Sequence, residues 1–456
     1  MKADVQIQTL ADISLDVSYG YTESAQVEPV GPRFLRITDI QNGVVDWPTV
    51  PYCTIDNRRL PNYLLQRGDI VVARTGNSTG ENYIFDSSEQ AVFASYLIRF
   101  RIDHNKANPF FVWYQLRTPR WWNFVAGSKT GSAQAGANAQ VLGRFEITLP
   151  SRHDQDRIAE QLIRIDSKIA VNRRINQTLE AMAQAIFQSW FVDFYPVKAK
   201  IAAKAEGRDP LRAAMSAICG KSDPELDGLS PEQYDLLAAT AAMFPDEMKE
   251  SELGSIPKEW TLQSAETLAE VGIGKTPPRK EPQWFTEGEG DWRWVSIRDM
   301  GASGVFQQRS SEFLTADAVS RFNVRVVPDR TVLLSFKLTI GRVAISDGPM
   351  VTNEAIAHFK LPSNATISSE YLYLYLKVFD YSTLGSTSSI ADAVNSKTIR
   401  ELPIVVASGD VIDRFTKSVA PLFEEMRNRQ NEIASLGATR DALLPKLLSG
   451  EIEVPL

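Results

Sequence analysis

The chain has 456 residues, 43% of them hydrophobic, and its 49 basic and 56 acidic residues give a formal charge of −7. A chain of this length and hydrophobicity can bury a large share of its surface, which predicts about three folding units and excludes a disordered tail. The excess of acidic residues argues at first against a nucleic-acid partner, because phosphate binding normally requires an excess of Lys and Arg.

The cysteines, the histidines and the hydrophobic runs exclude further classes of protein. Cys53 and Cys219 are too few for a disulfide framework, and none of the three histidines lies at metal-ligand spacing from another ligand, so we expect no metal site. The amino-terminal segment lacks the pattern of a signal peptide, and no run approaches 18 apolar residues. These features predict a cytoplasmic protein without a membrane segment.

Residues 1–151 have the pattern of a mixed α/β domain. Short apolar runs bounded by Gly, Asn and Asp predict strands at DIVVA (69–73) and within FASYLIRF (93–100). The aromatic amphipathic stretch PFFVWYQLRT (109–118) predicts a helix. We assign this range to a first domain.

Residues 152–194 follow as a long charged segment of helical period. Seam residues recur in alternating steps of four and three, which is the a/d pattern of a coiled coil. The seam positions are Ile158, Leu162, Ile165, Ile169, Asn172, Asn176, Leu179 and Ile186. The next segment, 195–257, is rich in Ala, Asp, Glu and Pro and is expected to be a partly helical surface connector.

Residues 258–408 repeat the first domain. Sliding the sequence against itself aligns RITDI (36–40) with SIRDM (296–300), and RGDIVVARTGNSTG (67–80) with VPDRTVLLSFKLTIG (327–341). Strands are predicted at TVLLSF (331–336) and RVAIS (342–346), and a helix at EYLYLYLKVF (370–379).

Residues 409–456 form a second helical segment whose seam matches the first. Its positions are Phe415, Val419, Leu422, Met426, Arg429, Ile433, Leu436 and Leu443. Pro421, Gly437 and Pro445 predict kinks or breaks. Two matched seams favour pairing with each other over two amphipathic helices that each lie on their own domain. We therefore predict an α+β fold, with two mixed α/β domains in a pseudo-symmetric repeat, separated by two long helices that form an antiparallel coiled coil.

No catalytic constellation is recognisable in the sequence. Methylation of a base nitrogen needs a glycine-rich cofactor loop and an Asn/Asp-Pro-Pro-aromatic loop, but the nearest match, NPFF (108–111), lacks the second proline. GKT (274–276) resembles part of a phosphate-binding loop, but Ala269 replaces the required glycine and two prolines follow. The chain is predicted to be non-enzymatic.

Polar loops occupy matching places in both domains. RTGNSTGEN (74–82) corresponds to SFKLTIG (335–341), and GSKTGSAQ (127–134) to GSTSSIAD (385–392), while GKTPPRK (274–280) occurs in the second domain alone. Arg, Lys, Asn, Gln, Ser and Thr bind base edges and phosphates, although such loops are more often only solvated turns. Their duplication favours nucleic-acid binding.

The chain resembles the specificity subunit of type I restriction-modification systems over nearly its whole length. The stretches that carry the resemblance are GKTPPRK (274–280), WVSIRDM (294–300), LSFKLTIGRVAI (334–345), TGSAQ (130–134), IFQSWFVDFYPVKAK (186–200), SELGSIPKEW (251–260) and LLPKLLSGEI (443–452). The resemblance implies a non-catalytic subunit that recognises a bipartite, asymmetric DNA target, one half per domain, while the coiled coil sets the gap.

The resemblance also implies the partners and the cofactors. Double-stranded DNA, two modification subunits that methylate adenine and restriction subunits with motor and nuclease activity are the expected partners. We expect no cofactor in this chain, and S-adenosylmethionine, ATP and Mg on the partner subunits. Two alternatives stay open: a complex that only methylates, and a coiled-coil scaffold with peptide- or carbohydrate-binding lobes.

By position, the resemblance places DNA contacts in the matching loops. In the first domain they are Arg74, Thr75, Asn77, Ser78, Asn82, Lys129, Thr130, Ser132 and Gln134. In the second domain they are Lys275, Thr276, Arg279, Lys280, Lys337, Thr339, Ser386, Thr387 and Ser388. The first domain has SYGYTESAQ (18–26) where the second has its TPPRK loop. The two domains are therefore expected to contact DNA differently through these loops.

The distribution of charge answers the initial objection to DNA. Most of the acidic excess lies in the connector and the final helix, while both domains are close to neutral. Nearly neutral domains must rely on local clusters of Lys and Arg and on basic partner subunits to hold phosphates. We therefore expect strong DNA binding only inside the complex.

Overall fold

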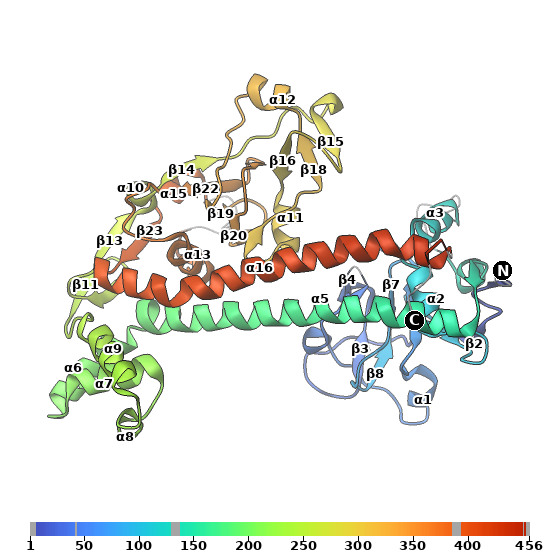
Figure 1. The fold of residues 1–456 in the computed structure, drawn as a ribbon, viewed down its shortest axis with the longest axis horizontal. Helices are drawn as coiled ribbons and strands as arrows, with labels where there is room; N and C mark the ends of the chain where they lie inside the picture. Colours follow the sequence, from blue (N-terminus) through green and yellow to red (C-terminus); the bar gives the residue numbers. More distant parts are fainter. Residues whose placement is uncertain (1–5, 42, 129–136, 385–393, 450, 453–456) are drawn as a thin grey trace. The chain divides into compact units, whose positions relative to one another are not determined.

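The computed structural model describes residues 6–41, 43–128, 137–384, 394–449 and 451–452. The chain divides into two compact units, one containing residues 1–170 and 434–456 and the other residues 171–433 (Figure 1). Each of the two long helices contributes one part to each unit. Among the described residues, no helix combines the length and the hydrophobicity needed to cross a membrane.

The first lobe, residues 6–151, is built around a four-stranded antiparallel sheet. Its strand order is β2 (Ser14–Tyr19), β9 (Leu97–Ile102), β6 (Asp69–Ala73) and β7 (Asn82–Ile84). Three smaller pairs join β1 (Gln6–Thr9) to β10 (Glu146–Leu149), β3 (Arg33–Leu35) to β8 (Ala91–Phe93), and β4 (Ile40–Gln41) to β5 (Val44–Val45). The α-helices are α1 (Leu60–Tyr63), α2 (Pro109–Gln115), α3 (Pro119–Ser128) and α4 (Ala139–Leu142).

The second lobe, residues 258–408, has a five-stranded sheet. Its order is β14 (Glu270–Ile273), β22 (Ile356–Lys360), β19 (Val332–Ser335), β20 (Val343–Ser346) and β17 (Phe306–Gln307). A second sheet joins β15 (Phe285–Glu287), β18 (Glu312–Leu314), β16 (Trp292–Val295) and β21 (Val351–Thr352), and β13 (Thr261–Ser264) pairs with β23 (Pro403–Val406). The helices are α10 (Ala265–Leu268), α11 (Ile297–Ala302), α12 (Ala316–Arg321), α13 (Ser369–Val378) and α15 (Ser396–Arg400).

The two lobes share one topology. The order β14-β22-β19-β20 corresponds to β2-β9-β6-β7, the antiparallel pair β13–β23 to β1–β10, and the parallel pair β16–β21 to β3–β8. A local turn is repeated as well, since Asp39 accepts a 2.8 Å hydrogen bond from the Arg36 amide and Asp299 accepts one of 2.8 Å from the Ser296 amide. The predicted pseudo-symmetric repeat of two mixed α/β domains is present in the fold.

The hydrophobic runs form the elements that their patterns predict. The run 69–73 is the fully buried strand β6, and the runs 331–336 and 342–346 contain β19 and β20. The aromatic stretches at 109–118 and 370–379 form the buried helices α2 and α13. Asn108 caps α2, because its Oδ1 accepts hydrogen bonds from the amides of Phe110 and Phe111, which gives this residue a structural role.

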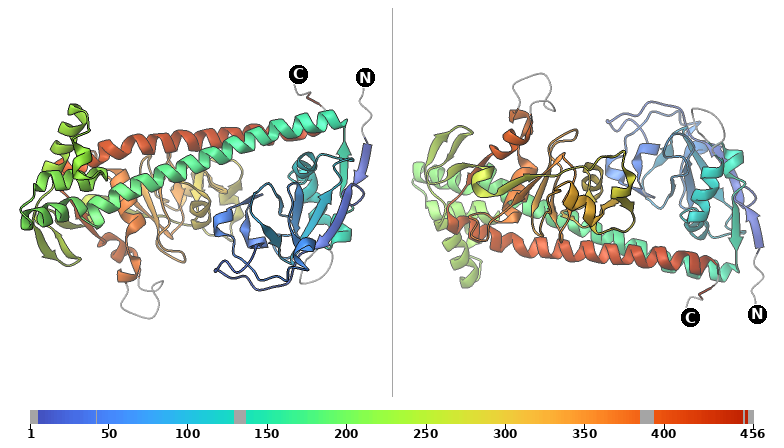
Figure 2. Two further views of the ribbon diagram at one scale, coloured as in Figure 1. Left: turned by 90° about the horizontal axis from the view of Figure 1, so that it is seen from below. Right: turned by 90° about the horizontal axis from the view of Figure 1, so that it is seen from above.

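Two long helices pair in opposite directions. They are α5 (Arg152–Phe187), extended by a π-helical turn (Gln188–Val192), and α16 (Gly409–Leu448). In the second unit, Phe187 at the end of α5 and Trp190 in the π-helical turn pack on Phe415 near the start of α16. In the first unit, Leu162 near the start of α5 belongs to one core cluster with Leu444 near the end of α16. Within each unit, Figure 2 shows the two helices side by side, so the pair is antiparallel.

The predicted break in the final helix is wrong. α16 is a continuous helix of 40 residues through Pro421, Gly437 and Pro445. A proline inside a helix costs about 3 kcal/mol, because it removes one hydrogen bond and crowds the preceding turn. Val419, Phe423 and Met426 around Pro421 are fully buried, and this tertiary packing offsets the cost.

The connector, predicted to be partly helical, contains helices and a β-hairpin. It contains α6 (Tyr195–Ala205), α7 (Pro210–Cys219), α8 (Asp223–Leu226) and α9 (Pro231–Ala242), then the hairpin β11 (Met248–Ser251) and β12 (Gly254–Pro257). Its prolines Pro210 and Pro231 occupy first helical positions, where a missing amide does no harm. Ala214, Met215, Leu226 and Ala241 form a small core of their own.

Candidate nucleic-acid interface

The polar loops of the second lobe leave one edge of its central sheet. β22 lies between β14 and β19 and runs antiparallel to both, so β14 and β19 end on the same side. Ile273 and Leu334, near these two ends, both pair with Ala357. The loops 274–280 and 336–341 therefore begin about 10 Å apart, which is two strand spacings.

The first lobe has the same arrangement. β9 separates β2 from β6, and Tyr19 and Val72 both pair with Ile98 near the ends of those strands. The loops 20–26 and 74–81 leave this edge. We call these four loops, 20–26 and 74–81 in the first lobe and 274–280 and 336–341 in the second, the edge loops.

A glycine begins the first edge loop in each lobe. A Cβ at Gly20 would lie 2.2 Å from the Ala94 carbonyl oxygen, and a Cβ at Gly274 would lie 2.1 Å from the Asn353 carbonyl oxygen. In each case the backbone oxygen belongs to the turn before the central strand. Only glycine allows this close approach, so both lobes hold the loop against the sheet by the same device.

The 274–280 loop places its predicted residues unequally. The Lys275 ammonium donates a 2.6 Å hydrogen bond to the Phe322 carbonyl, and Thr276 donates to Glu354. Arg279 forms two hydrogen bonds with Glu312, at 2.6 and 2.9 Å, and Lys280 is exposed at the end of the loop. Three of the four side chains are thus held by contacts within the lobe.

The Arg279 guanidinium also lies over two aromatic rings. Its guanidinium carbon lies 4.2 Å from the ring centre of Phe285 and 4.4 Å from that of Trp294. Hydrogen bonding to Glu312 raises the pKa of Arg279 above its usual value. The planar group is therefore oriented before any ligand arrives, in the manner suited to two-point recognition of a base or a phosphate.

The second edge loop of this lobe presents Lys337 and Thr339 with exposed side chains. Between them lies Leu338, which is 90% exposed. The buried Ser335 holds the base of the loop, since its hydroxyl donates to the Thr339 carbonyl at 2.6 Å. Both predicted residues are accessible to a ligand.

In the first lobe, Arg74 lies over the Tyr19 ring, 5.1 Å from its centre, and its Nε donates to the Ser95 carbonyl at 3.1 Å. Asn77 is exposed at the tip of the loop, while Thr75 and Ser78 are half-buried. Arg74 thus connects the second edge loop to the end of β2, beside the first edge loop.

The prediction of Asn82 as a DNA contact is wrong. Its side chain is 3% exposed, and its Nδ2 donates to the carbonyls of Gly80 at 3.0 Å and Leu116 at 2.9 Å. Asn82 begins β7 and fixes the end of the loop to α2, so it stabilises the loop without reaching a ligand. Seven predicted contacts lie outside the described residues: Lys129, Thr130, Ser132, Gln134, Ser386, Thr387 and Ser388.

Sequence reasoning missed several residues at these edges. Tyr19 and Ser95 orient Arg74, while Glu312 and Glu354 hold residues of the 274–280 loop. One feature of the sequence marks this edge of the sheet in both lobes. Gly20 and Gly274 each directly follow the first strand of the sheet.

The predicted coiled-coil positions lie in α5 and α16. All sixteen are buried or half-buried. The polar ones meet each other: Asn172 is fully buried, donates to Glu432 at 2.9 Å and accepts from Arg429 at 3.2 Å. Asn176 donates to the Met426 carbonyl at 3.2 Å.

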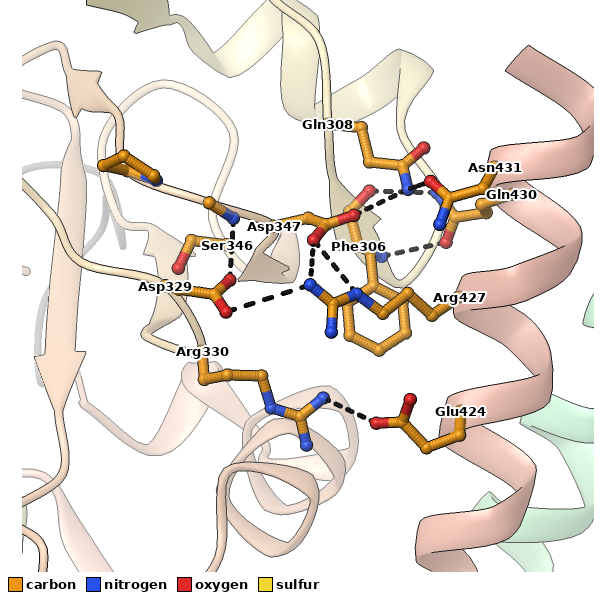
Figure 3. Close-up of polar contacts among 12 residues, drawn as sticks. Phe306, Gln308, Asp329, Arg330, Ser346, Asp347, Glu424, Arg427, Gln430 and Asn431 are labelled. Atoms are coloured by element: carbon orange, nitrogen blue, oxygen red, sulfur yellow. Dashed lines mark hydrogen bonds and ion pairs between the residues drawn. The ribbon is translucent and has the colours of Figure 1, made fainter. Parts of the chain in front are cut away.

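A polar cluster joins α16 to the second lobe (Figure 3). The Gln430 amide accepts a 3.0 Å hydrogen bond from the Phe306 amide and donates one of 2.9 Å to the Phe306 carbonyl. Arg427 Nε donates to Asp347 at 3.0 Å, and Gln308 donates to Asn431 at 2.7 Å. Within the second unit, this cluster fixes the lobe on the helix.

Two side chains of this lobe, Asp347 and His358, have pKa values below their usual range. Burial alone would raise the pKa of Asp347, but hydrogen bonds from Arg427 and Gln308 outweigh it and lower the pKa. Burial lowers the pKa of His358 to about 3, so this histidine is neutral in the folded lobe. No group of His, Cys, Asp and Glu able to hold a metal ion occurs among the described residues.

Known proteins match this chain over most of its length. The type I restriction enzyme HindI specificity subunit of Haemophilus influenzae is 29% identical, over 99% of this chain and 100% of that protein. The MjaIX specificity subunit of Methanocaldococcus jannaschii is 23% identical, over 75% of this chain and 69% of that protein. The solved type I restriction-modification S subunit from M. genitalium is 14% identical with a TM-score of 0.48, over 98% of this chain and 96% of that chain.

A family model described as the type I restriction modification DNA specificity domain matches residues 34–181 and 257–408. The family provides DNA specificity, a role distinct from that of the methylase and nuclease subunits, which agrees with the prediction of a non-catalytic subunit. Because the two matches cover more than half of the chain, the protein belongs to the family of type I restriction-modification DNA specificity subunits.

Proposed function

We propose that this chain recognises a bipartite, asymmetric DNA target, with one half bound by each lobe. The observation that supports this proposal is the repeated sheet edge, which has the same strand order and loop placement but different side chains in the two lobes. Arg74 stacks on Tyr19 in the first lobe, whereas Arg279 stacks on Phe285 in the second. One scaffold with two sets of loops would bind two base sequences, because base contacts specify and backbone contacts position.

The helices would set the gap between the two half-targets. α5 has 36 residues, which corresponds to about 54 Å at 1.5 Å per residue and exceeds the roughly 34 Å of one DNA turn. The buried contacts of Asn172 with Arg429 and Glu432 favour one register of the pair, since a shift along the seam would separate these polar groups. A fixed register gives a fixed gap.

Partner subunits would carry out the chemistry. We propose two modification subunits with S-adenosylmethionine for adenine methylation, and restriction subunits with ATP and Mg for DNA cleavage, acting in the cytoplasm. The near-neutral charge of each lobe supports shared recognition, because a phosphate backbone is held mainly by basic residues. The isolated chain should therefore bind DNA weakly, and binding by the complex should fall steeply with salt.

The decisive experiment maps methylated adenines across a genome in cells that express the modification subunits with and without this chain. The expected result is a bipartite motif that is methylated only when the chain is present. A contiguous motif, or a methylation pattern that does not depend on the chain, would refute the proposal. Salt-insensitive binding to a non-nucleic partner would favour a scaffold instead.

The gap is tested by adding one heptad to each helix. The insertions go between Ala170 and Val171 in α5 and between Ile433 and Ala434 in α16, where the two units divide, so that the seam stays in phase on both sides and the contacts of α16 with the second lobe are kept. Seven residues add about 10 Å, so the accepted gap should grow by about three base pairs. The same seven residues inserted at the exposed Gly228 of the connector serve as the control, and an unchanged gap in the helix variant would contradict the spacing role.

A further inference from the structure

The second edge loop of the second lobe carries a leucine in an unfavourable conformation. Leu338 has a φ of +62°, in the left-handed region, and its side chain is 90% exposed. The Thr339 amide donates a 2.7 Å hydrogen bond to the Lys337 carbonyl, which makes Leu338 the centre of a γ-turn with positive φ, a rare and strained turn. Strain of this kind persists where surrounding structure imposes it, and it clusters at functional sites.

The loop around Leu338 is firmly held. The hydroxyl of the fully buried Ser335 donates to the Thr339 carbonyl at 2.6 Å and accepts from the Arg342 amide at 3.0 Å. The Gly341 amide donates to the Ser335 carbonyl at 3.0 Å and closes the loop. Leu338 therefore projects from a fixed support.

The corresponding loop of the first lobe also has a residue with positive φ, but this residue is a glycine. Val72 and Leu334 hold matching places in the strands β6 and β19, and Gly76, four residues after Val72, corresponds to Leu338, four residues after Leu334. Gly76 has a φ of +71°. The loop there is closed in the same way, since the Gly80 amide donates to the Ala73 carbonyl at 2.9 Å. A positive φ at this place in the loop is common to both lobes, and the exposed apolar side chain distinguishes the second. A difference of this kind fits a role in specificity.

We propose that Leu338 contacts the 5-methyl group of a thymine in the half-target bound by the second lobe. The inference rests on the proposed function. Aliphatic side chains distinguish thymine through this methyl group in the major groove, and the flanking Lys337 and Thr339 offer donors for the adjacent phosphates or base edges. Insertion of Leu338 between base pairs fits less well, because a side chain with so few neighbours has little support against the cost of unstacking.

The test uses the assembled complex and the target identified by methylation mapping. Each thymine of the second half-target is replaced, one at a time, by deoxyuridine, which lacks only the methyl group. One replacement should weaken binding by the wild-type complex about fourfold, the effect of one buried methyl group. In complexes with Leu338→Ala or Leu338→Gly, the same replacement should have no effect, and the thymine duplex should already bind at least fourfold more weakly.

The two variants separate the side chain from the backbone. Glycine relieves the positive φ and alanine retains it, so equal loss of thymine preference assigns the effect to the apolar side chain. Leu253→Ala is the matched control, because Leu253 is 44% exposed in the β11–β12 hairpin outside the lobe, and its complex should keep the preference.

Three results would overturn the assignment. One is a wild-type complex that tolerates deoxyuridine at every position, another is a Leu338 variant that keeps the wild-type sensitivity, and the third is loss of a partner subunit from the Leu338 variants. Failure of the proposed function would look different, because the wild-type complex would then bind target and scrambled duplexes equally.

Discussion

The substitution Gln430→Ala tests how the second lobe is held on α16. The Gln430 side chain makes two hydrogen bonds with the backbone of Phe306, which is fully buried at the start of β17. In Gln430→Ala the Phe306 carbonyl keeps its 2.8 Å hydrogen bond from the Ser303 hydroxyl, whereas the Phe306 amide loses its Gln430 acceptor. An unsatisfied buried donor costs about 1–3 kcal/mol and the second bond about 1 kcal/mol, so we expect a loss of about 2–4 kcal/mol.

Urea denaturation of the complete chain measures this loss in the transition of the second unit, and hydrogen exchange at the Phe306 amide reports it locally. Exchange at this amide should accelerate strongly in Gln430→Ala. Asn431→Ala is the control, because the exposed Asn431 accepts from Gln308, which keeps its 2.8 Å bond to Asp347. A loss under 0.5 kcal/mol for Gln430→Ala, on the order of a neutral surface substitution, or unchanged exchange at Phe306, would refute the reasoning.

Three further variants test other parts of the structure. The pKa of His358 is about 3 in the folded lobe and about 6.5 in the unfolded chain, so its stabilising contribution is present at pH 7 and should fall by about 2 kcal/mol by pH 5. Urea titrations at the two pH values should show this loss, and His358→Gln should lack it. Lys280→Ala should weaken binding of the complex to all DNA sequences and lower the slope of log K against log salt by about 1, while Lys221→Ala in the connector should not. Asn172→Leu should destabilise the helix pair by about 1–3 kcal/mol in thermal melts, because Arg429 and Glu432 lose their buried partner, and an unchanged melting temperature would show that this polar contact is dispensable.

Elements whose hydrophobic pattern agrees with their tertiary surroundings were predictable from sequence. The run DIVVA is buried on all sides and became β6, and the alternation of seam residues became two paired helices. The unbroken course through Pro421 was not predictable, because a local proline rule cannot include the packing of Val419 and Phe423. The connector core escaped prediction for the same reason, since its short helices gain stability only by packing together.

The candidate interface was predictable as a set of loops but not as a set of side chains. The internal repeat predicts where the edge loops lie, because equivalent strands end at equivalent places in the two lobes. Pairing of side chains depends on contacts distant in sequence, such as Arg279 with Glu312 and Arg74 with Tyr19. Asn82 looked like its polar neighbours in the loop, and only the fold shows that both of its amide hydrogens are committed to backbone carbonyls.

The ion pair between Arg279 and Glu312 relates the near-neutral charge of the lobes to the balance between specific and non-specific DNA binding. The guanidinium already has a carboxylate partner within the lobe, so the proposed contact with DNA would exchange one charge-assisted interaction for another. A non-specific phosphate offers little net gain in this exchange, whereas a base edge of matching geometry offers two aligned acceptors. The pairing of Arg279 with Glu312 would therefore weaken non-specific binding more than specific binding. A subunit built in this way would depend on its partners for affinity and contribute specificity itself, which is the division of labour that the charge distribution predicts.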